Sequence, residues 1–245
     1  MMMKKTVLAV VTISLLGLAG CSAVSTAVSK RNLDVQTKMS DTIFLEPAAE
    51  RSVYLQIRNT STEQGLAIEP KLRQALQSKG MVISTNPDTA QYWVQANVLS
   101  IGKMDLRDAQ SALLSGYGAG ALGATALAGA MAYNSSSGGA VLGAGLVGAL
   151  AGVAADAMVE DTNYTMITDL QIAQKSPKGV AVTTNNLAML KQGNSGGQIQ
   201  TSTQTGERHK YQTRVVSNAN QVNLDFVDAQ PVLEDQLAAS LSGLF

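Results

Sequence analysis

An uncharged segment, residues 109–155, constrains this chain more than any other feature. Asp108 and Asp156 bound it, and Ala, Gly, Leu and Val predominate between them. A single polar interruption, residues 134–139, divides the segment into two arms of about twenty residues, the length that an apolar helix needs to cross a hydrocarbon core of ~30 Å. The sequence therefore predicts a transmembrane helical hairpin with a polar turn.

Small residues recur at every fourth position in both predicted helices, residues 111–133 and 140–159. Such stripes let helix backbones approach closely, and this packing drives helix association in lipid. A composition rich in Ala and Gly could also give this pattern by chance. A buried soluble hairpin is disfavoured because Gly inside a helix costs about 1 kcal/mol relative to Ala, and the many Leu residues disfavour a flexible loop. We expect a cyclic homo-oligomer that packs through Gly116, Gly120, Ala124, Ala128, Ala140, Ala144, Gly148 and Gly152.

The N-terminus predicts export and lipid attachment. Two lysines precede an apolar run, residues 7–18, which has the length of a signal-peptide core. The run leads into Leu-Ala-Gly-Cys, which resembles the lipobox of bacterial lipoproteins. Cleavage would then fall between Gly20 and Cys21, and Cys21, the only cysteine, would be acylated. An ordinary signal peptide or a first transmembrane helix is the alternative. By the same resemblance, Ser22 implies sorting to the outer membrane.

The remaining segments predict an α+β domain with an antiparallel sheet, packed helices and the hairpin inserted in it. Residues 52–58 and 162–173 alternate between apolar and polar side chains, which indicates half-buried strands. Pro70 and Gly80 are typical of the two ends of a helix. We expect further strands at residues 43–45, 81–83, 92–101, 180–184 and 211–216, and helices at 68–79 and 228–244. The expected boundaries are a signal peptide (1–20), an acylated tether (21–40), the first part of the domain (41–108), the hairpin (109–159) and the second part of the domain (160–245).

Two further segments are candidates for contact with lipid headgroups or with a partner. Charged residues on both sides of the hairpin, at residues 102–108 and 156–161, would lie at the headgroup level of a membrane. Residues 192–208 are rich in Ser, Thr, Gln and Gly, which predicts a long loop or an exposed hairpin. That segment is a candidate contact surface, and a solvated loop without a partner is the alternative.

No arrangement of residues indicates catalysis, a metal site or a cofactor. His209 is the only histidine and lies in a polar stretch, which is typical of a surface residue. Gly118, Gly120 and Gly123 match dinucleotide-binding spacing, but no strand precedes them and no acidic residue follows at the required distance. The formal net charge is zero and no basic patch stands out, which argues against a nucleic-acid partner. We expect a protein that is not an enzyme.

Several features together resemble the TraT family, the surface-exclusion and complement-resistance lipoproteins of conjugative plasmids. They are the lipobox, the Ala/Gly hairpin at residues 112–155, and its flanking segments Tyr-Trp-Val-Gln-Ala-Asn (92–97) and Thr-Asn-Tyr-Thr-Met (162–166). The resemblance implies a surface-exposed outer-membrane protein that prevents stable mating contact and reduces killing by complement. Implied partners are a mating-contact surface protein and complement components, in addition to the further copies of the chain expected from the small-residue stripes and the outer-membrane lipid expected from the lipobox. No catalytic residue is implied.

A structural or channel-forming ring of helices in the outer membrane is the alternative function. Polar residues are scarce in the two arms, which favours a plug or an anchor over a wide aqueous pore.

Overall fold

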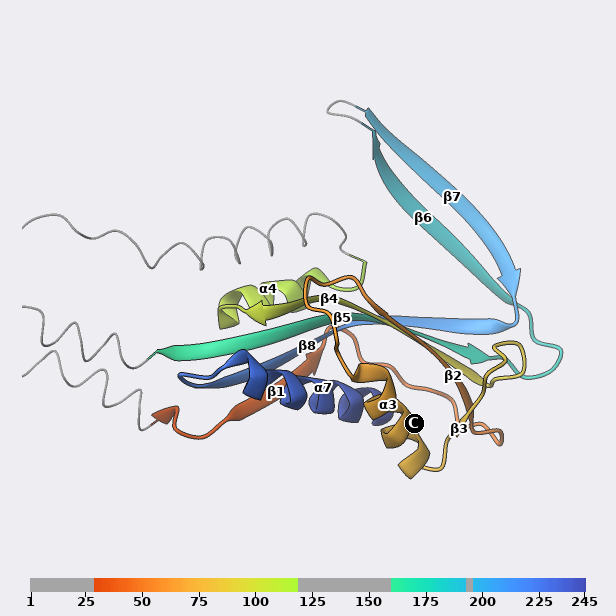
Figure 1. Cartoon of the computed structure of the whole chain (residues 1–245). Helices are drawn as coiled ribbons and strands as arrows, with labels where there is room; N and C mark the ends of the chain where they lie inside the picture. The colour runs from red at the N-terminus through yellow and green to blue at the C-terminus, as the bar shows by residue number, and fades with distance from the viewer. Residues whose placement is uncertain (1–28, 119–159, 193–195) are drawn as a thin grey trace, which may run out of the picture.

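The computed structural model describes residues 29–118, 160–192 and 196–245 (Figure 1). In this part of the chain six strands form one sheet in the order β1-β8-β5-β4-β2-β3, and two further strands form a separate ribbon. The strands of the sheet are β1 (Asp34–Met39), β2 (Ser52–Asn59), β3 (Val82–Ile83), β4 (Tyr92–Lys103), β5 (Asp161–Lys175) and β8 (Arg208–Val222). The ribbon consists of β6 (Val182–Gln192) and β7 (Gly196–Gly206), and the helices are α3 (Ile68–Ser78), α4 (Leu106–Ser115) and α7 (Phe226–Ser242).

The sheet joins segments from both sides of residues 119–159. β5 pairs antiparallel with β4, which precedes that gap, and with β8, which follows it. β1 is antiparallel to β8, but β2 runs parallel to both β3 and β4. The sheet is therefore mixed. The pairing of β4 with β5 shows that the alternating segment 162–173 belongs to the sheet begun earlier in the chain, whereas the domain boundaries themselves stay predictions.

One face of the sheet carries the main apolar core. α3 and α7 pack against each other and lie on this face (Figure 1). The alternation of the strands directs apolar side chains towards these helices, and burial of such surface stabilises a fold by about 25 cal/mol per Å². Fully buried members of this core include Leu72, Leu76, Val94, Leu170, Ile172, Leu233 and Leu237.

A charged contact reinforces the packing of the two core helices. Lys71 of α3 lies 3.2 Å from Glu234 and 2.8 Å from Asp235 of α7, and its Nζ donates to the carbonyl of Pro231. Glu234 is buried, and its Oε1 accepts a hydrogen bond from the backbone N–H of Ala67 at the start of α3. α7 thereby satisfies a backbone donor at the N-terminus of α3 that the helix itself leaves unpaired.

The opposite face is only partly covered. α4 lies on it (Figure 1), and a small apolar cluster there includes Met104, Ala109, Ala112, Ile167 and Val216. The amphipathic pattern of α4 accounts for this placement, since its two alanines are buried while Leu106 and Leu114 are exposed. This second cluster is much smaller than the core beneath α3 and α7.

The fold class predicted from the sequence is wrong in two respects. The sheet is mixed and not purely antiparallel. In addition, no helix within the described ranges is long and apolar enough to span a membrane. The expected first arm, residues 111–133, does not form one helix from its start: α4 begins earlier, at Leu106, and ends at Ser115. Gly116 and Gly118 then have φ of +71° and +65°, a left-handed conformation that terminates a helix. The rest of the predicted hairpin lies outside the described residues.

The segment before the predicted arm belongs to two elements of the described fold, while its expected place at the headgroup level stays a prediction. Residues 102–103 end β4, and residues 106–108 form the first turn of α4. Hydropathy could not separate this amphipathic helix from the apolar segment that follows, because both are rich in Ala and Leu.

One smaller prediction is also wrong. Residues 43–45 do not form a strand, although Ile43 is buried in the core and Phe44 is exposed. Instead, β1 lies within the expected tether and forms the edge of the sheet. The predicted helices at 68–79 and 228–244 agree with α3 and α7 to within about two residues at each end.

Candidate interaction surface

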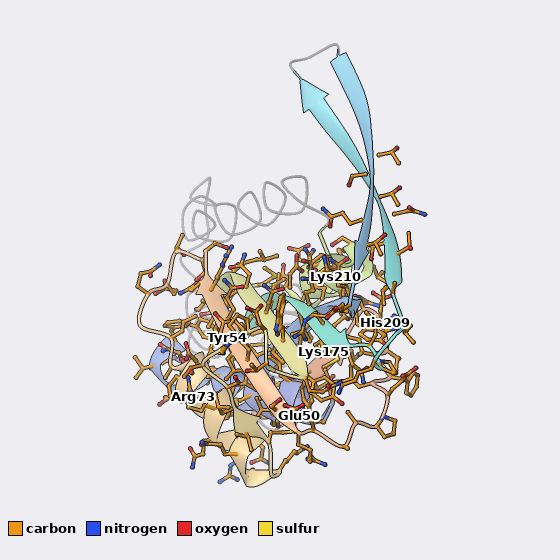
Figure 2. The ribbon with its side chains drawn as sticks, turned by 90° about the vertical axis from the view of Figure 1, so that its right-hand side faces the viewer. Glu50, Tyr54, Arg73, Lys175, His209 and Lys210 are labelled. Atoms are coloured by element: carbon orange, nitrogen blue, oxygen red, sulfur yellow. The ribbon has the colours of Figure 1, made fainter. Side chains whose placement is uncertain are left out.

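Polar side chains form rows on the part of the sheet that no described helix covers. Successive residues of a strand point to opposite faces, and the register aligns the polar positions of β2, β4, β5 and β8. We call this surface the open face and define it by Tyr54, Gln56, Arg58, Trp93, Gln95, Gln171, Lys210 and Gln212. Figure 2 shows Tyr54 on β2 and Lys210 on β8, on either side of it.

A ladder of four glutamines crosses the open face. Gln56, Gln95, Gln171 and Gln212 lie side by side on four neighbouring strands. Nε2 of Gln212 donates to Oε1 of Gln171 at 2.7 Å, Gln171 donates to Gln95 at 2.7 Å, and Gln95 donates to Gln56 at 2.6 Å. The three bonds run in one direction, so that each amide polarises the next. The ladder holds the polar surface in one arrangement.

The ladder extends to the end of the first described range. Gln212 forms a side-chain hydrogen bond with Tyr117, the second-last residue of that range. Burial raises the pKa of the Tyr117 hydroxyl and the charge of Asp169 raises it further, while the bond with Gln212 lowers it. Tyr117 therefore stays protonated at neutral pH and can act as a hydrogen-bond donor at this end of the ladder.

A buried ion pair lies beside the ladder and fixes the end of α4. Arg214 and Asp169 have side-chain exposures of 2% and 13%, and two hydrogen bonds join them, Nε to Oδ1 at 2.7 Å and Nη2 to Oδ2 at 3.1 Å. Nη1 of Arg214 donates to Ser115 Oγ at 2.8 Å and to the carbonyl of Ala112 at 3.4 Å. A cation at a helix C-terminus interacts favourably with the helix dipole.

The same pair also holds the chain that leaves α4. The backbone N–H of Gly118 donates to Oδ2 of Asp169 at 3.2 Å. The ion pair thus sets the point at which the chain passes from the sheet towards residues 119–159. This arrangement is structural: it positions a segment and offers no free nucleophile or base.

An aromatic and cationic contact forms the other border of the open face. The guanidinium of Arg208 lies 4.2 Å from the centre of the Trp93 ring, a cation–π geometry. Its nitrogens donate to the carbonyls of Pro87, Ala90 and Gln91. Burial lowers the pKa of Arg208, while the charges of Asp88 and Glu207 raise it. Arg208 is therefore occupied in joining the start of β8 to the loop before β4.

A pocket opens beside this contact, at the base of the ribbon. Its volume is about 510 Å³, and Trp93, Lys175 and Lys210 contribute to its wall. Figure 2 shows Lys175, His209 and Lys210 close together at this end of the sheet. Neither lysine forms an ion pair with a described acidic residue, so that both cations are available to a partner.

The ribbon of β6 and β7 projects from this end of the sheet (Figure 1). Its strands pair in one continuous antiparallel register, from Val182 opposite Gly206 to Gln192 opposite Gly196. The prediction of an exposed hairpin at residues 192–208 is thus correct in part, because β7 forms one strand of it. The strand expected at 180–184 is longer than the sequence indicated and forms the other strand.

The residues predicted for lipid attachment and helix packing fall largely outside the described ranges. Gly20 and Cys21 lie before residue 29, so cleavage and acylation stay predictions. Gly116 is described and follows the last residue of α4. The other predicted packing positions, Gly120, Ala124, Ala128, Ala140, Ala144, Gly148 and Gly152, lie outside the described residues. His209 is half-buried in β8, and the described residues contain no group of three or more His, Cys, Asp or Glu side chains that could hold a metal ion.

Sequence reasoning missed the ladder and the buried ion pair. The alternation of β2 and β5 places Gln56, Asp169 and Gln171 on polar faces. Their neighbours could not be identified, because the register between β4, β5 and β8 depends on pairings across long sequence separations. The available signal was weak: glutamine at the polar position of several strands.

Comparison with known proteins gives a consistent result along nearly the whole chain. Residues 32–245 match the family model described as "Enterobacterial TraT complement resistance protein". A curated Escherichia coli protein named TraT complement resistance protein is 57% identical over 241 residues, which cover 98% of each chain. A second Escherichia coli protein of that name is 57% identical over 244 residues, which cover 100% of each. A protein of the same name from Wigglesworthia glossinidia brevipalpis is 31% identical over 245 residues, 97% of this chain and 95% of the relative.

Proposed function

We propose that this chain, which belongs to the TraT complement resistance protein family, protects the cell that carries it against killing by complement. Family membership over essentially the full length is the observation that carries this proposal. The open face supports it, since a protein that acts by contact needs an ordered polar surface, and none of the described helices covers this one. The family description names a resistance function and no reaction.

The protein acts from the outer membrane, to which acylated Cys21 attaches it. Acyl chains contribute about 0.8 kcal/mol per buried CH₂. Lys30 is already held on the domain, because the N–H of Val222 donates to its carbonyl at 3.0 Å and its Nζ donates to Asn220 at 2.7 Å. Lys30 is nine positions after Cys21, a reach of at most roughly 30 Å. This end of the sheet therefore stays near the lipid.

The contact surface lies towards the opposite end. Asp161 pairs with Val222 at the anchored end of β5 and β8, whereas Lys175 pairs with Arg208 at the end that carries the ribbon. The pocket beside Trp93 and the unpaired cations lie there. The lipid anchor and the cationic surface thus lie at opposite ends of the sheet. This arrangement supports a domain that contacts complement components, or a mating partner, through the open face and the base of the ribbon.

The protein also reduces mating contact and assembles into a homo-oligomer. The effect on mating follows from the family resemblance, and the homo-oligomer follows from the small residues of segment 109–155, which supply a surface suited to close packing. The alternative of a channel-forming ring depended on membrane-spanning arms. Because the fold class that contained those arms is wrong, we do not retain the channel.

Two assays with one set of strains test the function. Cells that express the chain should survive normal serum better than cells with an empty vector, and heat-inactivated serum should abolish the difference. As recipients, the same cells should receive a conjugative plasmid less often. Unchanged survival with the protein confirmed at the surface would refute complement resistance, and unchanged transfer would refute exclusion. Cys21→Ala should release the chain from the outer membrane; full retention there would refute the lipid anchor.

A further inference from the structure

The ribbon is an isolated pair of strands in the described part of the chain. β6 and β7 pair with each other, and neither pairs with a strand of the six-stranded sheet. None of the described helices or sheet strands packs extensively against them. A two-stranded hairpin alone is marginally stable in water at best. Eleven residues in each strand therefore form a long structure that no third strand or helix of the described ranges supports.

The outer edges of the ribbon lack the usual protection against strand addition. Natural proteins protect edges with short strands, charged side chains, Pro or bulges. The edges of the main sheet follow this rule, since β3 has two residues and β1 carries Asp34 and Lys38. The two strands of the ribbon contain no Pro and no acidic residue, and Lys191 is their single charge. Their pairing contains no register shift.

We propose that the ribbons of neighbouring copies pair edge to edge, β6 of one copy with β7 of the next. The inference rests on the self-assembly proposed above and names the surface that carries it. When β6 of each copy pairs with β7 of the next, the ribbons of all copies form one continuous antiparallel sheet. The backbone N–H and C=O groups of each outer edge then gain partners.

A second copy fits this surface better than an unrelated strand for two reasons. Each copy offers two different edges that no other described strand pairs with. A head-to-tail contact uses one edge for each neighbour, so that a ring of copies leaves no ribbon edge unpaired. The near absence of charge also means that identical ribbons do not repel one another. A strand from another protein would cover one edge and leave the other exposed.

A charge-pairing experiment tests this arrangement. Thr183 of β6 and Thr203 of β7 are both exposed. One variant carries Thr183→Lys with Thr203→Lys, and the other carries Thr183→Glu with Thr203→Glu. Each alone places like charges across the junction between copies, which disfavours strand pairing. We expect each variant alone to lose the assembly in detergent, and an equimolar mixture to recover the wild-type mass with both variants present.

The mixture separates a lost interface from a damaged ribbon, because repulsion within one chain is not relieved by mixing. The matched control is Gln74→Lys with Gln77→Lys, two exposed positions on α3, and it should assemble as the wild type does. A lysine variant that keeps the wild-type mass, or a mixture that stays monomeric, would overturn ribbon pairing and leave the proposed self-assembly standing. A monomeric wild type would overturn both.

Discussion

The two faces of the six-stranded sheet are ordered by different interactions. On one face α3 and α7 bury a continuous set of aliphatic side chains, including Leu72 and Leu233. On the other, α4 covers a small cluster, and the remaining surface is ordered by a hydrogen-bonded amide ladder and one buried ion pair. Most of the stability of the fold therefore comes from the first face, and the second face can present polar groups to a partner.

Leu72→Ala should give the largest loss of stability. Leu72 is fully buried under α7, and replacement of a buried Leu by Ala leaves a cavity and costs about 3–4 kcal/mol. Thermal or urea unfolding of the purified chain measures this. Leu114→Ala, at a side chain that is 79% exposed, is the matched control and should change the free energy of unfolding by less than about 0.5 kcal/mol. Equal effects would refute the unequal roles of the two faces.

Arg214→Met should give the next largest loss, about 3 kcal/mol, because it leaves the carboxylate of Asp169 buried without its partner. The double variant Arg214→Met with Asp169→Leu removes both charges and should recover much of that loss. Hydrogen exchange at residues 112–118 should increase in the single variant, since the ion pair holds the end of α4. A double variant as unstable as the single one would show that the unpaired charge of Asp169 is not the cause of the lost stability.

Gln171→Ala tests the ladder itself. Gln171 both accepts and donates a ladder bond, so that its loss removes two bonds, one from the half-buried Gln95 and one from the exposed Gln212, and should cost about 1–2 kcal/mol. Gln56, at the end of the ladder, accepts a single bond from Gln95, and Gln56→Ala should cost about half as much. Equal unfolding free energies for the two variants would argue against a cooperative ladder.

Lys71→Met should have a similarly small effect, about 0.5–1 kcal/mol, because the lysine is partly exposed and buried Glu234 keeps its hydrogen bonds from Ala67 and Gln230. Burial lowers the pKa of Lys71, but its hydrogen bonds with Asp235 and Glu234 raise it by more, so that the net pKa is above the ordinary 10.5. Its contribution is therefore complete below pH 10.5 and is lost as the pH rises through the folded-state pKa. The difference in unfolding free energy between the wild type and Lys71→Met should be constant near neutral pH and shrink above pH 10.5. A difference in unfolding free energy that grew above pH 10.5 would contradict the upward direction of the Lys71 pKa shift.

Local patterns predicted the elements whose own sequence is periodic. α3 follows from its apolar spacing with Pro70 near its start and Gly80 just after it. β2 and β5 follow from clean alternation. β1 was missed because it is a mostly polar edge strand with the composition of a tether. The start of the uncharged segment was misassigned because hydropathy registers apolar content and not the left-handed backbone at Gly116.

The candidate surface could be predicted only in part. Composition drew attention to residues 192–208, which include all of β7. The ladder and the Arg214–Asp169 pair are products of register across distant strands, and one sequence alone does not specify which glutamine meets which. Both therefore required the fold.

Serum survival of cells that express open-face variants is the most direct test of the central proposal, that this face makes the protective contact. Arg58 and Lys210 are exposed on the open face and form no ion pair with a described residue, so Arg58→Glu with Lys210→Glu reverses its charge without disturbing the core. The control is Gln74→Glu with Gln77→Glu on α3, which packs on the opposite face. At equal surface levels, we predict that the open-face variant loses most of its protection and that the control keeps it. Full protection by the open-face variant would contradict the proposal.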